Sequence, residues 1–192
     1  MKRLIIATSN AGKVIEIRSA VGNLSGWSLE PLPPDVLPIE ETGDSFLENA
    51  IQKAMPYSKL VDELTLADDS GLCVAALGGR PGVHSARYAE NPGARIQRLL
   101  GEMETVPDGR RDAVFYCALA LARSGRVLWT VQREVAGVIG RSPSGTEGFG
   151  YDPVFLLPEL NRTMAELSTE DKNRLSARGQ ALAELCKFLM SE

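Results

Sequence analysis

The chain has 192 residues, 44% hydrophobic and 24% charged, which excludes wholesale disorder and allows a core without metal or disulfide staples. We expect a single domain over residues 1–192. A formal net charge of −4 argues against broad nucleic-acid binding, although a local cationic pocket could still hold a small anion. Cys73, Cys117 and Cys186 lack metal-ligand spacing, which predicts reduced core residues. No apolar run reaches the length of a signal peptide or membrane span, so we expect a cytoplasmic protein without membrane contacts.

The N-terminal segment predicts a strand, a polar loop and a helix. Leu4 to Ala7 is continuously apolar, as in a strand buried on both faces. Thr8-Ser9-Asn10-Ala11-Gly12-Lys13 follows, and apolar residues then recur at helical spacing from Val14 to Val21. Backbone N–H groups at such a helix start attract phosphate, and Lys13 adds a cation; alternatively, the polar residues only cap the helix. The glycine spacing is not that of a P-loop, which disfavours a Walker-type kinase or ATPase.

A second helix is predicted after residue 45. Ser45 and Glu48 have capping-box spacing, and Pro56 predicts a kink or an end near Met55. The pair Glu40-Glu41 precedes this helix, where the helix start would stabilise its charge even without a functional role.

The segment Ala67-Asp68-Asp69-Ser70-Gly71-Leu72 follows a short apolar run. Its two acids and hydroxyl suit a magnesium site, because hard divalent cations take oxygen ligands and α/β sheets bind ligands beyond the carboxyl ends of their strands. The alternative is a polar turn, since Asp, Ser and Gly favour turns and Gly71 permits a sharp one.

The central region predicts a long hairpin. Alternating apolar residues at 113–121 and again at 127–135 flank Ser124-Gly125, the pattern of two antiparallel strands and a tight turn. Together with apolar strands that alternate with helices, the hairpin indicates a mixed α/β sheet. His84 is the only histidine, which disfavours multi-histidine metal sites and a serine–histidine–aspartate triad.

The C-terminal third contains a glycine-rich segment and a last helix. Glycines around Phe149 let a backbone approach a flat ligand while a ring stacks on it, although a plain connection is the alternative. The last helix is predicted from Ser168 or Thr169 to about Met190, with Lys172 and Arg178 beside its apolar stripe. These cations either reach solvent or point at an anion. Cations, acids and an aromatic glycine-rich loop together favour a nucleotide.

The chain closely resembles the inosine triphosphate pyrophosphatase family, which hydrolyses non-standard purine nucleoside triphosphates. The resemblance covers essentially the whole chain and rests on segments in family order and spacing: Thr8 to Lys13, Glu40-Glu41-Thr42-Gly43, Ala67 to Leu72, Ser85-Ala86-Arg87-Tyr88, Gly148-Phe149-Gly150-Tyr151-Asp152-Pro153 and Lys172 to Arg178. It implies a mixed, elongated central β-sheet with flanking helices and two lobes around a nucleotide cleft.

The resemblance also implies roles for individual residues. Asp69 matches the family's magnesium ligand and general base, with Glu40, Glu41 and Asp68 as further candidates at the metal. The matching substrate contacts are Thr8, Ser9, Asn10, Ala11, Gly12 and Lys13 at the triphosphate, Ser70, the base loop Phe149, Gly150, Tyr151 and Asp152, and Lys172, Ala177 and Arg178 near the C-terminus.

The implied activity is Mg²⁺-dependent hydrolysis of ITP, dITP or XTP to the monophosphate and pyrophosphate, by a homodimer. Where the family usually carries serine–histidine–arginine, this chain has Ser176-Ala177-Arg178, and the histidine normally helps to recognise the base. An alternative is therefore a nucleotide-binding homologue with weak or altered base selectivity. A third possibility is pyrophosphatase activity on another nucleotide, such as a modified pyrimidine.

Overall fold

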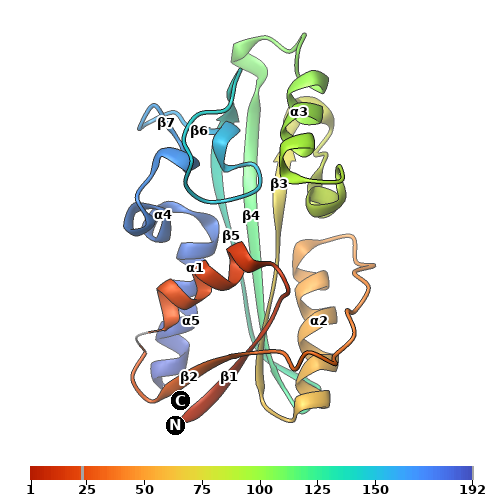
Figure 1. The fold of residues 1–192 in the computed structure, drawn as a ribbon, viewed down its shortest axis with the longest axis vertical. Coiled ribbons are helices and arrows are strands. Elements are labelled where there is room, and N and C mark those ends of the chain that lie inside the picture. The colour runs from red at the N-terminus through yellow and green to blue at the C-terminus, as the bar shows by residue number, and fades with distance from the viewer. Residues whose placement is uncertain (23, 192) are drawn as a thin grey trace. The chain divides into compact units, whose positions relative to one another are not determined.

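The computed structural model describes residues 1–22 and 24–191 (Figure 1). The chain forms two compact units: unit 1 comprises Met1–Asp69, Cys117–Arg133 and Arg178–Glu192, and unit 2 comprises Ser70–Tyr116 and Glu134–Ala177. The strands that the structure describes are β1 Lys2–Ala7, β2 Trp27–Pro31, β3 Leu64–Val74, β4 Asp112–Arg123, β5 Arg126–Ile139, β6 Phe155–Leu157 and β7 Arg162–Thr163. The helices are α1 Ala11–Val21, α2 Phe46–Val61, α3 Pro92–Glu102, α4 Thr169–Leu175 and α5 Ala177–Ser191.

The described strands form one mixed sheet in the order β2-β1-β3-β4-β5-β6-β7. β1 pairs in parallel with β2 and β3, whereas β6 pairs antiparallel with β5 and β7. The turn between β4 and β5 has positive φ at both central residues, 49° at Ser124 and 76° at Gly125, which suits the twist of a two-residue hairpin. The mixed α/β sheet with flanking helices and the predicted hairpin are thus confirmed.

Strand β3 corrects the predicted turn at the paired acids. It runs without interruption from Leu64 to Val74, so Asp68, Asp69 and Ser70 lie within a strand. Leu72 and Val74 are fully buried in a hydrophobic cluster, which holds the strand extended beyond the polar residues. Tertiary packing here overrides the local turn preference of Asp, Ser and Gly.

Helix α2 begins at Phe46 with both hydrogen bonds of the predicted capping box between Ser45 and Glu48. It does not end near Met55 but continues through Pro56 to Val61. Pro56 is exposed, so the carbonyl that lacks a partner can face water, and Tyr57 is buried in the turn that follows.

The predicted last helix is two helices. Ser176 has extended backbone, with φ −70° and ψ 154°, and separates α4 from α5. Lys172 and Arg178 therefore belong to different helices and to different units. Because no glycine or proline marks the break, the sequence pattern runs through it as one apolar stripe.

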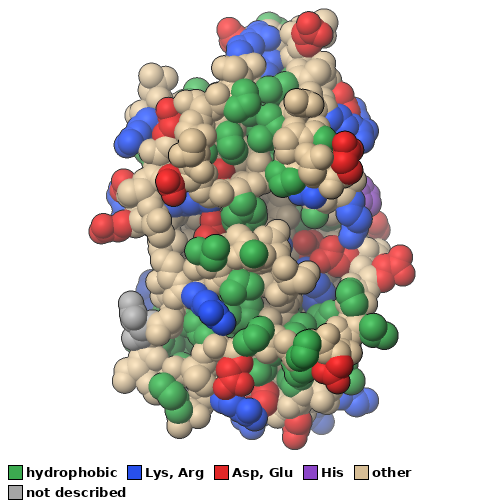
Figure 2. Space-filling model, in the orientation of Figure 1, with side chains coloured by type: hydrophobic (Ala, Val, Ile, Leu, Met, Phe, Trp, Pro, Cys, Tyr) green, Lys and Arg blue, Asp and Glu red, His purple; other side chains and the backbone are tan. Residues whose placement is uncertain are grey.

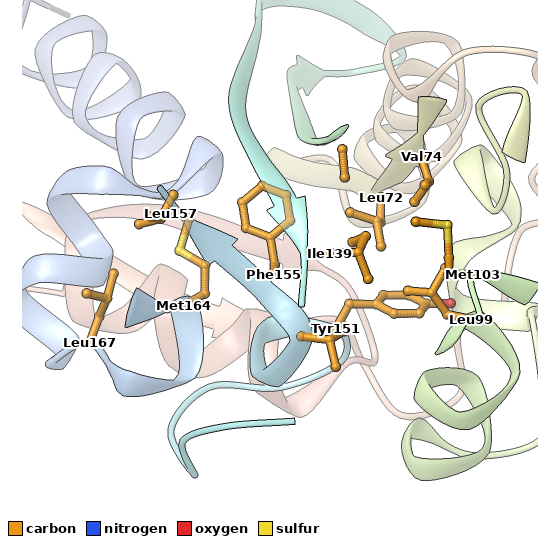
Figure 3. Close-up of a cluster of buried hydrophobic side chains, with 12 residues drawn as sticks. Leu72, Val74, Leu99, Met103, Ile139, Tyr151, Phe155, Leu157, Met164 and Leu167 are labelled. Atoms are coloured by element: carbon orange, nitrogen blue, oxygen red, sulfur yellow. The ribbon is translucent and has the colours of Figure 1, made fainter. Parts of the chain in front are cut away.

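Each unit has buried apolar residues of its own. In unit 1, Leu4 and Ile6 of β1 and Ile17 of α1 are at most 1% exposed. In unit 2 a cluster packs around Phe155, Leu72 and Tyr151 (Figure 3). The centroids of the Phe155 and Phe115 rings are 4.5 Å apart. None of the described helices combines the length and apolar character needed to cross a membrane.

Candidate active site

The loop before α1 is a helix cap that also presents a lysine. The Asn10 side chain accepts the Lys13 backbone N–H at 3.3 Å, and Thr8 Oγ1 accepts the Asn10 N–H at 3.2 Å. Ala11 and Gly12 follow in the first turn, while Ser9 is exposed. The Lys13 ammonium forms an ion pair with the Asp68 carboxylate. The capping role is thus observed, and the same segment brings a cation to the acids.

Asp68 is held among cations from α1 and α5. Its Oδ1 pairs with Lys13, and its Oδ2 accepts from the Arg178 Nε and the Cys117 thiol, both at 3.1 Å. Burial would raise the pKa of Asp68, but Arg178 and Lys13 outweigh it and hold the pKa well below its usual range. Burial and the Asp68 charge raise the pKa of the Cys117 thiol, which stays protonated as a donor.

Arg178 has a second acid partner. Its Nη1 lies 2.5 Å from Glu16 Oε2 on α1, and the Arg178 side chain is 9% exposed. Burial alone would lower the pKa of Arg178, whereas Asp68 and Glu16 raise it, so the guanidinium remains charged. The predicted cation at 178 is therefore present, tied to α1 and β3.

The hydrogen-bond and ion-pair partners described for Asp69 both come from α2. Its Oδ2 accepts from the Asn49 Nδ2 at 3.0 Å, and its Oδ1 lies 3.8 Å from the Lys53 Nζ. Burial raises the pKa of Asp69, Glu41 adds to the increase, and Lys53 and Lys13 offset only part of it. Since successive side chains of a strand point to opposite faces, neighbouring acids meet different helices. In Figure 1, α1 and α5 lie to one side of β3 and α2 lies to the other.

Lys53 connects several oxygens. Its ammonium lies 2.5 Å from Glu41 Oε1 and donates to the Asp68 carbonyl at 2.7 Å. Glu41 is half-buried, whereas Glu40 is exposed. Of the two predicted glutamates, only Glu41 thus has a described contact that brings it to the acids of β3.

One stripe of α2 side chains holds the irregular segment 37–45. Asn49, Gln52 and Tyr57 lie on the same side of the helix, whereas Glu48 acts at its N-terminus as part of the capping box. The bonds are Tyr57 with the Ile39 N–H and the Leu37 carbonyl, Gln52 with the Thr42 N–H, Asn49 with the Gly43 N–H, and Glu48 with the Asp44 and Ser45 N–H groups. The segment that carries Glu41 is therefore positioned by α2.

The donor set fits magnesium. Asp69 and Glu41 offer carboxylate oxygens, and the Asp69 Oδ1 is beyond hydrogen-bond distance from Lys53. Among the described residues, no group of three or more His, Cys, Asp or Glu side chains could enclose a metal ion. Magnesium is commonly bound by one or two carboxylates together with substrate phosphates and water, which matches such a partial set.

Unit 2 places the predicted base loop around a second buried ion pair. Asp152 Oδ2 accepts from the Lys172 Nζ at 2.6 Å and from the Phe149 N–H at 2.7 Å. The Lys172 ammonium lies 5.1 Å from the centroid of the Phe149 ring. Gly148 has φ +77°, and any side chain there would collide with Asp152 and Lys172. Lys172 thus lies with the aromatic loop.

The remaining predicted residues of unit 2 differ in accessibility. Tyr151 is 4% exposed, its ring lies in the hydrophobic cluster of Figure 3, and its hydroxyl donates to the Ser85 carbonyl at 3.0 Å. Any ligand contact at 151 must therefore come from the backbone. Gly150 has φ +64°, Ser70 is half-buried, and Ala177 is 4% exposed at the start of α5.

The sequence analysis missed three buried residues that contact the acids. Asn49 and Lys53 of α2 contact Asp69, and the Cys117 thiol contacts Asp68. A signal was available for the first two: Asn49 and Lys53 are polar residues, four apart, on the helix face that also buries Phe46 and Tyr57. For Cys117, which lies among apolar neighbours, no such signal exists.

A mixed sheet with a buried acid pair, cations from several helices and an aromatic glycine-rich loop defines a class of α/β protein suited to a nucleoside polyphosphate. The chain belongs to the Ham1 family, whose profile matches residues 4–188. The family resemblance seen in the sequence is thereby confirmed.

Several relatives match over almost their full length. A dITP/XTP pyrophosphatase from Gloeobacter violaceus is 50% identical, covering 96% of this chain and 93% of the relative. One from Bacillus subtilis is 44% identical, covering 98% of each chain. The structure of a HAM1 protein from Coxiella burnetii has a TM-score of 0.89 at 40% identity and covers 100% of each chain.

Proposed function

We propose that the chain is a Mg²⁺-dependent nucleoside triphosphate pyrophosphatase that hydrolyses ITP, dITP and XTP to the monophosphate and pyrophosphate. Such an enzyme removes deaminated purines from the nucleotide pool. The similarity to curated dITP/XTP pyrophosphatases over nearly the whole chain supports this activity. Both units together make up the single domain that carries it.

The observation that carries the proposal is the contrast between the two acids of β3. Asp69 has a raised pKa and one uncrowded oxygen, which suits a group that accepts a proton from the attacking water. Asp68 has a lowered pKa and holds two cations, which suits a permanent counter-charge. Environments that separate the pKa values of neighbouring acids are a mark of acid–base assignment.

The cations of unit 1 act on the triphosphate. Lys13 and Arg178 form ion pairs with Asp68, and both can stabilise negative charge on phosphate oxygens as the phosphoanhydride bond breaks. The N–H groups of the loop Thr8 to Gly12 add donors at the start of α1. Water adds its oxygen to phosphorus, its proton passes to Asp69, and pyrophosphate leaves.

The aromatic loop of unit 2 acts on the base. The Phe149 ring stacks on the purine, and Asp152 fixes the loop through the Phe149 N–H. Because the Lys172 ammonium lies beside that ring and Asp152, we assign Lys172 to the base rather than to the phosphates. A pocket built for a 6-oxo purine penalises amino-bearing bases by leaving polar groups unpaired.

Asp69 and Glu41 would hold magnesium, with Glu40 and Asp68 as further candidates. When bound, the ion neutralises phosphate oxygens and acidifies water. Asp68 is the weaker candidate because Lys13, Arg178 and Cys117 already occupy its oxygens.

The decisive test compares ITP, dITP, XTP, GTP, ATP and dUTP with and without Mg²⁺. Pyrophosphate and the nucleoside monophosphate are measured separately by chromatography. We expect equal amounts of both products, fastest release from ITP, dITP or XTP, and loss of release with EDTA. Release of orthophosphate instead of pyrophosphate, or equal rates on GTP and ATP, would contradict the proposal.

Ala177 favours a second candidate, a homologue that binds nucleotides with weak or altered selectivity. The residue is 4% exposed and offers no polar group at the position where the family resemblance implies a histidine. Calorimetry with ITP, run beside the same assay, separates the candidates. The second candidate would bind ITP yet release little pyrophosphate, or would release it faster from a modified pyrimidine nucleotide.

The proposal includes a cytoplasmic homodimer that binds no nucleic acid. Acidic and basic side chains are interspersed on the face shown in Figure 2, and the net charge is −4, which supports a surface that does not attract polyanions. Light scattering of the purified chain tests the dimer.

A further inference from the structure

Asn49 is a buried amide placed between two segments of the candidate site. It is 1% exposed on α2, its Oδ1 accepts the Gly43 N–H at 2.8 Å, and its Nδ2 donates to Asp69 Oδ2 at 3.0 Å. One side chain therefore joins the acid of β3 to the segment that carries Glu41.

We propose that Asn49 is a positioning residue for the reaction. It makes Asp69 Oδ1 the oxygen that accepts the proton and fixes this oxygen relative to Glu41. This inference rests on the proposed function, because it assigns Asp69 the role of base. Asn49 acts through Asp69 and Gly43 and does not itself touch the reacting atoms.

The residue type follows from hydrogen-bonding capacity. The Gly43 N–H can only donate, and an ionised Asp69 oxygen can only accept, so the partner between them needs one acceptor and one donor. An amide meets both needs in one orientation, which also fixes its Oδ1 and Nδ2. Occupation of Asp69 Oδ2 leaves Oδ1, whose described partner is Lys53 at 3.8 Å, to face substrate.

Gly43 shows that the other end of this connection is tight. A Cβ at Gly43 would lie 2.8 Å from Asn49 Oδ1 and 2.8 Å from the Glu48 Cβ, so even alanine must displace the amide or the helix. Glycine at 43 thus serves close approach of the segment to α2. The hydrogen bonds from Gly43 through Asn49 to Asp69 are therefore held by close packing of Gly43 against α2.

Three single variants separate the two ends of the connection. Asn49→Asp keeps an acceptor for Gly43 but places a carboxylate oxygen against Asp69. Gly43→Ala disturbs the amide while Asn49 stays intact. The matched control is Ser58→Ala, which removes a buried hydroxyl of α2 that binds the Met55 carbonyl and the Gly125 N–H and has no described contact with Asp69. The first readout is the split between kcat and KM for ITP.

We expect kcat to fall at least about 10-fold for Asn49→Asp and Gly43→Ala, with KM within about 3-fold, because misplacing a reacting group costs rate more than binding. Ser58→Ala should keep kcat within about 3-fold of the parent. Parental kcat in both test variants, or an equal loss in Ser58→Ala, would overturn the inference.

A second readout needs neither metal nor turnover. Urea unfolding of the metal-free protein is measured for Asn49→Asp, Asp69→Asn and the double variant, which restores an amide–carboxylate pair with its ends exchanged. We expect the double variant to recover at least about 10-fold in the folding equilibrium constant relative to Asn49→Asp, beyond the sum of the single effects. Additive effects would refute the contact even if the parent proved inactive on ITP, an outcome that by itself defeats only the proposed function.

Discussion

The two faces of β3 treat neighbouring aspartates in opposite ways. On the face toward α1 and α5, Asp68 meets Lys13, Arg178 and the Cys117 thiol, and its pKa is lowered despite complete burial. On the face toward α2, Asp69 meets one amide and a more distant ammonium, and burial raises its pKa. Adjacent residues of one type thus differ because a strand alternates its faces.

The contrast shows how a two-residue sequence can hold both a structural charge and a reactive one. Asp68 balances the charges of Lys13 and Arg178, the cations that would contact the phosphates in the proposed mechanism, so they can be held in the protein before substrate binds. Burial raises the pKa of Asp69 and the nearby cations offset only part of this increase, which suits the proton acceptor of the proposed mechanism. Exchanging the two environments would exchange the roles.

Removing the carboxylate on the α2 face should have the largest effect. We expect Asp69→Asn to lower kcat for ITP by about 10²- to 10⁴-fold, the usual contribution of a general base. Pyrophosphate release under saturating Mg²⁺ measures the loss, and thermal unfolding checks the fold. A variant that hydrolysed ITP at the parental rate would end the assignment of Asp69 as base.

On the other face, Asp68→Asn should mainly cost stability. It leaves the buried Arg178 and Lys13 without a full counter-charge, and breaking such a buried pair costs on the order of 3 kcal/mol. Urea unfolding measures the change in the free energy of unfolding. Arg178→Gln in the same chain should recover part of it, whereas a loss below about 1 kcal/mol for Asp68→Asn would mean that Asp68 is dispensable to the fold.

The pH dependence of stability should differ in sign between the two variants. Asp68 has a folded pKa below its ordinary 3.8, so its stabilisation is present above that pH and is lost as the pH falls further. Asp69 has a folded pKa above 3.8, so its favourable share is present below 3.8 and is lost as the pH rises through the folded pKa.

At neutral pH, Asp69→Asn should therefore be more stable than the parent and Asp68→Asn less stable. The Asp69 difference should disappear as the pH falls to 3.8, whereas the Asp68 difference should stay nearly constant down to 3.8 and shrink only below it. Urea unfolding from pH 3.5 to 8 without metal gives both curves. Curves of equal sign would show that the two faces are not electrostatically distinct.

The smallest expected effect concerns the base end. Ala177→His introduces the histidine that the family resemblance implies at this position, and one added hydrogen bond should raise the ITP-to-GTP ratio of kcat/KM by about threefold. Ala177→Leu is the control for bulk, because residue 177 is only 4% exposed. An unchanged ratio in both variants would show that another residue already supplies this selectivity.

Much of the fold could be predicted because it depends on local patterns. Continuous apolar runs gave β1, alternation and Ser124-Gly125 gave the β4–β5 hairpin, and capping residues gave the start of α2. The wrong predictions concern segments whose structure depends on contacts between residues far apart in the sequence. β3 continues through a turn-like sequence because Leu72 and Val74 are buried in unit 2, and the break at Ser176 has no local marker.

The structure brings several of the predicted site residues together, but through contacts that could not be predicted from the sequence. The carboxylates, Lys13 and the aromatic loop could be named from the sequence, whereas the division of Asp68 and Asp69 between different helices required the register of a strand that was expected to turn. The partners Asn49 and Lys53 depend on which face of α2 meets β3, and no single-sequence pattern determines that.

The polar stripe on α2 has a consequence for amide hydrogen exchange. The N–H groups of Ile39, Thr42 and Gly43 lie in an irregular segment, yet each donates to an α2 side chain. Their deuterium uptake should thus follow the opening of α2 rather than the rapid exchange of a solvated loop. The segment that carries Glu41 should therefore open and close together with the helix.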